Sequence, residues 1–172
     1  MVPIKIAIVS DVAPPYIGGG EVITLNLAKR IAKNHEVVWI TSRLPGTKPY
    51  EFVDGVEIRR FWIPFSKHYL RTRVTFSLIS LPHIIGNDYD VVQFNSFVAA
   101  VGGSLYPFRN KIAFVWELFL DLWKNIGKNA IEKTLYPYVE RIIAHGFEYY
   151  AALSNYSKMC LTKLGVNENR VK

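Results

Sequence analysis

The alternation of apolar runs and helical patterns at the start of the chain limits the fold more than any other feature. Residues 4–10 form a compact apolar run rich in β-branched side chains, as in a buried parallel strand. Over residues 20–33, Asn26, Lys29 and Lys33 recur with a helical period and leave an apolar face opposite. Residues 36–42 are a second apolar run. The pattern predicts a strand, a helix and a second strand parallel to the first.

The same alternation continues along the chain. Asp54-Gly55 predicts a turn before a third strand, and Gly165 suits a left-handed cap after the last helix. We expect Pro82 to kink its helix or end it early. Later strands are expected at 56–62, 90–95, 111–116 and 149–153, and later helices at 69–85, 97–106, 128–146 and 155–164. Six strands alternating with helices predict one Rossmann-like α/β domain over residues 1–172, with an open, mostly parallel β-sheet and helices on both faces.

The composition is that of a folded protein. Of the 172 residues, 50% are hydrophobic and 20% are charged, which excludes a disordered chain. The single cysteine, Cys160, forms no internal disulfide, so a reducing compartment is expected, and its place on a helix favours a small buried hydrophobe. The uncharged stretch 91–108 is interrupted by Gln93, Gly102 and Pro107, which argues against a membrane span. We therefore expect a soluble, cytoplasmic protein.

A glycine-rich loop separates the first strand from the first helix. It comprises residues 14–21 and contains Gly18, Gly19 and Gly20 followed by Glu21. Glycines at a helix start let backbone N–H groups approach a phosphate, with the helix dipole behind them. The loop contains neither the G-x-G-x-x-G dinucleotide fingerprint nor a P-loop. Two interpretations stay open at this point, an anion site and a turn without a ligand.

The wider pattern resembles the N-terminal domain of GT-B glycosyltransferases of the glycosyltransferase family 4 type. The landmarks that carry the resemblance occur in the family's order over nearly the whole chain. They are Pro15-x-x-Gly18-Gly19-x-Glu21, Leu27-Ala28, His35-Glu36-Val37, Asp54-Gly55-Val56, the strand at 90–95, Leu153-Ser154-Asn155-Tyr156-Ser157-Lys158 and Leu164-Gly165-Val166. The resemblance implies a transferase of two Rossmann-like domains that moves a sugar from a nucleotide-sugar donor to an acceptor hydroxyl, with retention of configuration.

The resemblance also implies how the work is divided between the two domains. This chain corresponds to the acceptor side, whereas a C-terminal domain, absent from the chain, would hold most of a UDP- or GDP-sugar donor. The N–H groups of Gly18, Gly19 and Gly20 would lie near the donor diphosphate, and Glu21 would fix the loop or the helix start. The acceptor would be a sugar or a lipid-linked molecule. We expect the domain by itself to bind no cofactor and to be inactive.

One position departs from the family. After the fifth predicted strand the family has a His, where this chain has Trp116 followed by Glu117. Trp116 would stack on a sugar and Glu117 would act as a base, or Trp116 is simply a buried residue at a strand end. Asn95 and Ser96, at the end of the fourth predicted strand, are further acceptor-pocket candidates. Glu140 and Glu148 match the spacing of the family's donor-domain acids, but we reject them as surface acids because the glycine-rich context is missing.

A basic and aromatic segment follows the third predicted strand. It carries Arg59, Arg60, Trp62, Lys67, Arg71 and Arg73 without an acidic residue between Glu57 and Asp88, in a chain of net charge +7. Such a segment fits an anionic membrane surface, which would place the protein peripherally at the inner face of the membrane. It equally fits a phosphorylated or lipid-linked acceptor, or a solvated helix face over core aromatics.

Two rivals remain for the chain as a whole. A non-catalytic Rossmann-like regulatory or anion-binding module would keep the sheet and the loop without sugar transfer. A nucleic-acid-binding role has the charge in its favour but no recognition motif, so no nucleic acid partner is expected. His35, His68, His83 and His145 are too scattered to predict a metal site.

Overall fold

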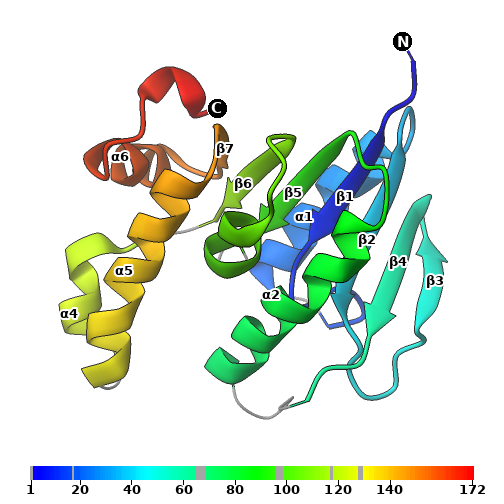
Figure 1. The fold of residues 1–172 in the computed structure, drawn as a ribbon, viewed down its shortest axis with the longest axis horizontal. Helices are drawn as coiled ribbons and strands as arrows, with labels where there is room; N and C mark the ends of the chain where they lie inside the picture. The colour runs from blue at the N-terminus through cyan, green and yellow to red at the C-terminus, as the bar shows by residue number, and fades with distance from the viewer. Residues whose placement is uncertain (1, 17, 65–68, 96–98, 117, 128–129) are drawn as a thin grey trace.

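The computed structural model contains one seven-stranded sheet in the order β3-β4-β2-β1-β5-β6-β7 (Figure 1). It describes residues 2–16, 18–64, 69–95, 99–116, 118–127 and 130–172. The six parallel strands are β1 (Lys5–Val9), β2 (Glu36–Ser42), β4 (Val56–Phe61), β5 (Val91–Asn95), β6 (Lys111–Val115) and β7 (Tyr149–Ala152). These confirm the six expected strands and the open, mostly parallel α/β fold.

The centre of the sheet follows directly from the apolar runs. β1 pairs in parallel with β2 on one side and with β5 on the other. Such a central strand is covered on both faces, which is why Ala7, Ile8 and Val9 are all fully buried. The first helix, α1 (Gly19–Ile31), packs Ala28 on one face of the sheet, over Trp39 and Ile58. The predicted strand, helix and parallel strand are confirmed.

The seventh strand, β3 (Tyr50–Val53), was not expected. It pairs antiparallel with β4 through a tight turn at Asp54-Gly55, where both residues have positive φ angles of 50° and 85°. It lies at the edge of the sheet, and its side chains are exposed or half-buried. An edge strand needs no apolar run, which explains why hydrophobicity alone did not reveal it. The predicted turn at Asp54-Gly55 is confirmed, but it is a hairpin turn.

The opposite face of the sheet carries α2 (Tyr69–Ile85), the π-helical turn η1 (Ala99–Gly103) and α5 (Ala130–Gly146) (Figure 1). Pro82 lies inside α2, which continues to Ile85, so of the two expected alternatives, a kink or an early end, the early end is wrong. The helix expected at 97–106 is shorter, and its first two residues lie outside the described part. Pro137 lies within α5.

The rest of the chain is folded into short helices beside this layer. The 3-10 turn η2 (Leu120–Leu122) and α4 (Trp123–Ile126) were not predicted. The expected last helix is α6 (Asn155–Lys163), and Gly165 follows it with φ 94°, as predicted. The turn η3 (Glu168–Arg170) leads to Val171, which bridges to Tyr150.

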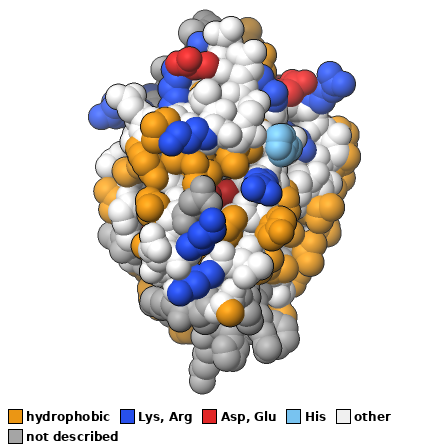
Figure 2. Space-filling model, turned by 90° about the vertical axis from the view of Figure 1, so that its left-hand side faces the viewer, with side chains coloured by type: hydrophobic (Ala, Val, Ile, Leu, Met, Phe, Trp, Pro, Cys, Tyr) orange, Lys and Arg blue, Asp and Glu red, His pale blue; other side chains and the backbone are white. Residues whose placement is uncertain are grey.

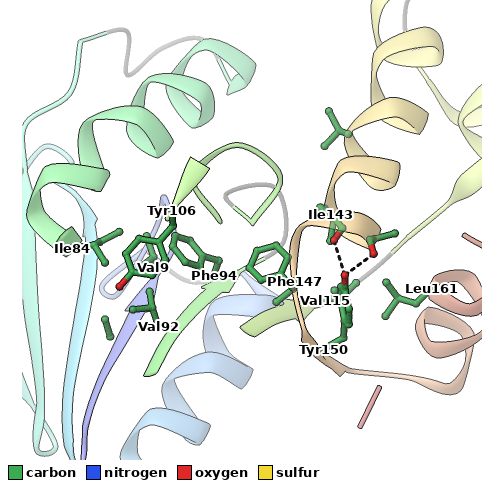
Figure 3. Packing of buried hydrophobic residues seen from close by; sticks show 14 of the residues in the cluster. Val9, Ile84, Val92, Phe94, Tyr106, Val115, Ile143, Phe147, Tyr150 and Leu161 are labelled. Atoms are coloured by element: carbon green, nitrogen blue, oxygen red, sulfur yellow. Dashed lines mark hydrogen bonds between the residues drawn. The ribbon is translucent and has the colours of Figure 1, made fainter. Parts of the chain in front are cut away.

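Aromatic side chains join the layers on this face (Figure 3). Phe94 of β5 contacts Tyr106 and Phe147, and Phe147 in turn contacts Tyr150. The Tyr150 hydroxyl donates to the carbonyls of Ile143 and Ala144 at 3.1 and 2.6 Å, so β7 is tied to the last turns of α5. Burial raises the pKa of Tyr150. No helix in the described ranges combines the length and apolarity needed to cross a membrane.

Candidate functional site

A cavity of about 460 Å³ lies at the carboxyl edge of the sheet, where open parallel sheets bind their ligands. Its walls come from the start of α1, the end of β6, the loop before α4, the inner side of α5, and the residue after β7. The described lining residues are Gly19, Gly20, Glu21, Ile23, Arg73, Val115, Trp116, Leu118, Phe119, Trp123, Val139, Glu140, Ile143 and Leu153. The glycine loop and Trp116, predicted as separate site elements, are therefore brought together.

The glycine loop forms the start of α1. Gly18 is the N-cap, and its N–H donates to the Glu21 carboxylate at 2.8 Å. Glu21 thus holds the helix start, as expected, and its charge suits the positive end of the helix dipole. The N–H groups at the start of a helix have no partner four residues back, so those of Gly19 and Gly20 are directed to the site by the helix geometry.

Trp116 lies directly on Gly20. A Cβ atom built on Gly20 would be 2.3 Å from the Trp116 ring, so only glycine leaves room for the indole there. The Trp116 carbonyl accepts from the Ser157 hydroxyl at 3.2 Å, which ties the end of β6 to α6. The indole N–H is buried and has no hydrogen-bond partner among the described residues. Trp116 therefore covers one side of the helix start, and its indole N–H is enclosed by the protein.

A buried ion pair lies under the same site. Asp11 follows β1, and its carboxylate is 2.9 Å from Nε of Arg73, which reaches over from α2. Burial raises the pKa of Asp11, with the Arg73 guanidinium acting in the opposite direction. The sequence assigned Arg73 to a patch for an anionic membrane or an anionic acceptor, and it did not single out Asp11. A polar residue directly after the central strand was the available signal for Asp11.

Glu140 shapes the other wall. This α5 residue is 4% exposed, and its carboxylate accepts from the N–H groups of Phe119 and Leu120 at 2.8 Å each and from Trp123 Nε1 at 2.7 Å. Leu120 has a positive φ of 50°, so the carboxylate holds an unusual backbone turn in place. The prediction that Glu140 is a surface acid is therefore wrong, because its carboxylate is buried and holds the loop before α4. Glu148 is exposed and pairs with Arg109.

Other predicted acceptor contacts are placed differently. Asn95 is 1% exposed, and its amide donates to Thr24 Oγ1 at 3.1 Å and accepts from Gln93 at 2.9 Å. It joins β5 to α1 under the helix, so the expectation that it lines an acceptor pocket is wrong. A residue near the end of a buried strand points into a helix interface as readily as into a cleft. Ser96 and Glu117 lie outside the described residues, and their roles stay predictions.

The basic and aromatic segment does not form one patch. Arg60 is 5% exposed and binds Glu51 and the carbonyls of Pro14 and Lys48, so its assignment to an exposed patch is wrong. Arg59 pairs with Glu57, which raises the pKa of Arg59, and Trp62 is 70% exposed. Arg73 is in the pocket instead. Arg59 and Arg60 differ in exposure because neighbouring residues of a strand point to opposite faces of the sheet, whereas Arg73 lies on helix α2. Lys67 lies outside the described residues, as does the side chain of Arg71.

Known structures share this fold. The match to sucrose-phosphate synthase from Thermosynechococcus elongatus covers 98% of this chain and 47% of the synthase chain, with 17% sequence identity and a TM-score of 0.69. The match to the catalytic domain of starch synthase IV from Arabidopsis thaliana, bound to ADP and acarbose, covers 99% of this chain and 51% of that domain. The sequence identity is 12% and the TM-score is 0.68. The match to UDP-N-acetylglucosamine 2-epimerase from Rickettsia bellii covers 98% of this chain and 44% of the epimerase chain, with 8% sequence identity and a TM-score of 0.60.

These matches show a GT-B-type Rossmann-like domain, and the chain spans about half the length of the structures it matches. No curated protein sequence matches the chain significantly. The family model described as Glycosyltransferase Family 4 matches residues 17–172, which include Gly18, Gly19 and Gly20 of the glycine loop and every described strand after β1. The chain belongs to glycosyltransferase family 4.

Proposed function

We propose that this chain is the N-terminal, acceptor-binding domain of a glycosyltransferase that moves a sugar from a nucleotide-sugar to an acceptor hydroxyl with retention of configuration. The observation that carries the proposal is the cavity at the carboxyl edge of the sheet, which joins the start of α1 to Trp116 and Arg73. Family membership supports it, since the matched region includes this cavity. A UDP- or GDP-sugar would be held mainly by a second domain, so the isolated chain turns over nothing.

The proposal gives each part of the site a task. The N–H groups of Gly19 and Gly20 stabilise negative charge on the departing nucleotide diphosphate. Gly18 is engaged by Glu21 in this structure, so its N–H serves the helix start rather than the donor. Trp116 forms the acceptor wall, and Glu117 supplies the base. Arg73, with the Asp11 carboxylate beside it, sets the positive charge at the floor of the site.

One observation favours the second candidate, a non-catalytic Rossmann-like binding module. The Trp116 ring lies against Gly20 at the position where the family has a His, and it covers one side of the helix start. In that case the chain binds a ligand at the cavity and supports no transfer. A lipid-linked acceptor and a peripheral position at a membrane are parts of the glycosyltransferase proposal, and they are tested together with that proposal.

The experiment is a transfer assay on the native protein as its cells make it. The protein is incubated with UDP- and GDP-sugars and a panel of glycoside acceptors, and products are identified by mass spectrometry. Transfer is expected, and Trp116→Ala should lower kcat/KM by about tenfold or more. Arg109→Ala is the control, since Arg109 is 90% exposed and precedes β6, at the opposite edge of the sheet. Ligand binding without any product would favour the non-catalytic module.

A further inference from the structure

The helices on the two faces of the sheet present different outer surfaces. On α1, the outward positions are largely polar: Asn26 and Arg30 are exposed, and Val22 is the one exposed large hydrophobic side chain of this helix. Lys33, just after the helix, is exposed too. This is the ordinary pattern of a helix that packs one side on a sheet and turns the other toward water.

Helix α5, on the opposite face, is apolar outward as well as inward. Leu135, Tyr138 and Ile142 recur at helical spacing and are 40%, 58% and 45% exposed, whereas Val139 and Ile143 of the same helix line the cavity. The helical segments in and beside this layer also expose large hydrophobic side chains, at Val74, Leu78, Ile85, Leu122 and Ile126. A helix that is apolar on both sides normally lies between two apolar layers, and the described residues cover only the inner side of α5.

The exposed charges on α4 and α5 are basic. Lys124, Lys133 and Arg141 are exposed, and the Arg141 guanidinium lies 5.9 Å from the centre of the Tyr138 ring, within reach of a cation–π contact. The one described acidic side chain on these two helices, Glu140, is buried and accepts three N–H bonds within the protein. Figure 2 views the side on which α4 and α5 lie and shows hydrophobic side chains interspersed with more Lys and Arg than Asp and Glu.

This combination fits an anionic lipid bilayer. Exposed Leu, Ile and Tyr side chains enter the boundary between the headgroups and the acyl chains, while cations beside them stay at the headgroups. Each Lys or Arg close to an anionic membrane strengthens binding about fivefold. A second copy of the chain docked through the same surface would instead bring like charges together, which disfavours that partner.

We propose that the outer surface of α4 and α5 binds an anionic phospholipid bilayer. This assignment moves the membrane contact away from the basic and aromatic segment, in which Arg60 is buried and Arg59 is paired. The same two helices form a wall of the cavity through Trp123 and Val139, so docking holds the cavity beside the bilayer, where a lipid-linked acceptor would be supplied. The inference rests on the proposed function for that purpose alone, because membrane binding is measured without sugar transfer.

The test is co-sedimentation of the native protein with vesicles of phosphatidylcholine, alone or mixed with phosphatidylglycerol. We expect binding to the mixed vesicles and little binding to the neutral ones. Lys133→Gln and Arg141→Gln should each weaken that binding about fivefold, whereas Lys33→Gln, at an exposed position beyond α1, should bind like the parent. Binding should also weaken as salt rises from about 0.1 M to about 1 M, since the Debye length shortens from about 10 Å to about 3 Å.

A matched apolar pair locates the contact. Ile142 and Val22 are β-branched residues on helices that cover opposite faces of the sheet, and they are 45% and 44% exposed. Ile142→Ser should weaken binding to the mixed vesicles by about threefold or more, and Val22→Ser should leave it unchanged. Trp62→Ser tests the basic and aromatic segment directly and should also bind like the parent. Thermal unfolding checks that each variant is folded.

The inference is overturned if the native protein does not bind the mixed vesicles, if Ile142→Ser and Val22→Ser behave alike, or if Trp62→Ser alone weakens binding. A dimer that Ile142→Ser dissociates in sedimentation equilibrium would indicate a second copy on this surface. Lower thermal stability of Ile142→Ser with unchanged vesicle binding would indicate a cover within the protein, and either result would overturn the inference. Product formation from soluble acceptors judges the proposed function separately.

Discussion

At the scale of single residues, the site depends on contacts that tolerate little change. Gly20 is the clearest case, because the Trp116 ring occupies the space that any side chain would need. The sequence singled out both residues but for separate tasks, one for phosphate and the other for the acceptor. Their contact was not predictable, since they lie on α1 and after β6 and no local pattern links them.

Neighbouring glycines give a direct test of this contact. Gly20→Ala should lower the free energy of unfolding by about 1–3 kcal/mol, because the new methyl group displaces the indole. Gly19→Ala has nothing within 4 Å of its Cβ and should be neutral or stabilising by about 0.4–1 kcal/mol. Urea unfolding gives both values, and tryptophan emission should shift only in Gly20→Ala. Equal stability of the two variants would refute the packing.

Glu140 and Glu148 provide a second pair. Glu140→Gln places an amide N–H₂ against existing donors and should lower the free energy of unfolding by about 1.5–3 kcal/mol. Glu148→Gln should change the free energy of unfolding by less than about 1 kcal/mol. Its partner Arg109 is 90% exposed, and the Arg109 nitrogen is 3.5 Å from the Glu148 carboxylate. Chemical denaturation distinguishes the two. Similar small losses in both variants would mean that the Glu140 carboxylate does not hold the loop before α4.

At the scale of elements, the sequence predicted what hydrophobic patterning determines. The six parallel strands and the main helices α1, α2, α5 and α6 were expected because each buries an apolar run or face. The elements that were missed, β3, η2 and α4, depend on tertiary contacts: β3 pairs at an edge, and the loop before α4 is held by Glu140. Helix α2 continues past Pro82 to Ile85, the full range expected for it, so the proline does not end the helix early.

The link between β7 and α5 gives a prediction at this scale. Tyr150→Phe removes both hydrogen bonds to α5 and should lower the free energy of unfolding by roughly 1–2 kcal/mol near neutral pH. Since burial raises the pKa of Tyr150, the unfolded phenol ionises first, so this contribution is lost as pH rises above 10.0 toward the folded value.

Denaturation at pH 7 and at intervals from pH 9 to 11 measures this effect. The fall in stability with rising pH should be shallower in Tyr150→Phe than in the parent chain. Tyr138→Phe, at an exposed position of α5, is the control and should follow the parent. Identical slopes in all three proteins would contradict the assigned role of the Tyr150 hydroxyl.

At the scale of the whole molecule, the fold places the site before any side chain is considered. Parallel strands end at one edge of the sheet, and the cavity lies there, as the topology predicts. The sequence singled out Gly19, Gly20, Glu21 and Trp116, and all four line this cavity. It misplaced Asn95 and Arg60, because packing decides which way the side chains of a buried strand point. Arg73 lines the cavity, as the acceptor-groove alternative for the basic segment allowed.

The most direct test of the central claim maps ligand contacts on this chain. Amide and indole N–H signals of the ¹⁵N-labelled protein are followed while glycoside acceptors and then UDP-glucose or GDP-mannose are added. We expect the largest shifts at Gly19, Gly20, Leu118 and Leu153 and at the Trp116 indole, one of four tryptophans, which Trp116→Phe identifies. Signals of β3 and β4 should stay unchanged. Shifts centred on those strands, or no shifts with any ligand, would contradict an acceptor site at the carboxyl edge of the sheet.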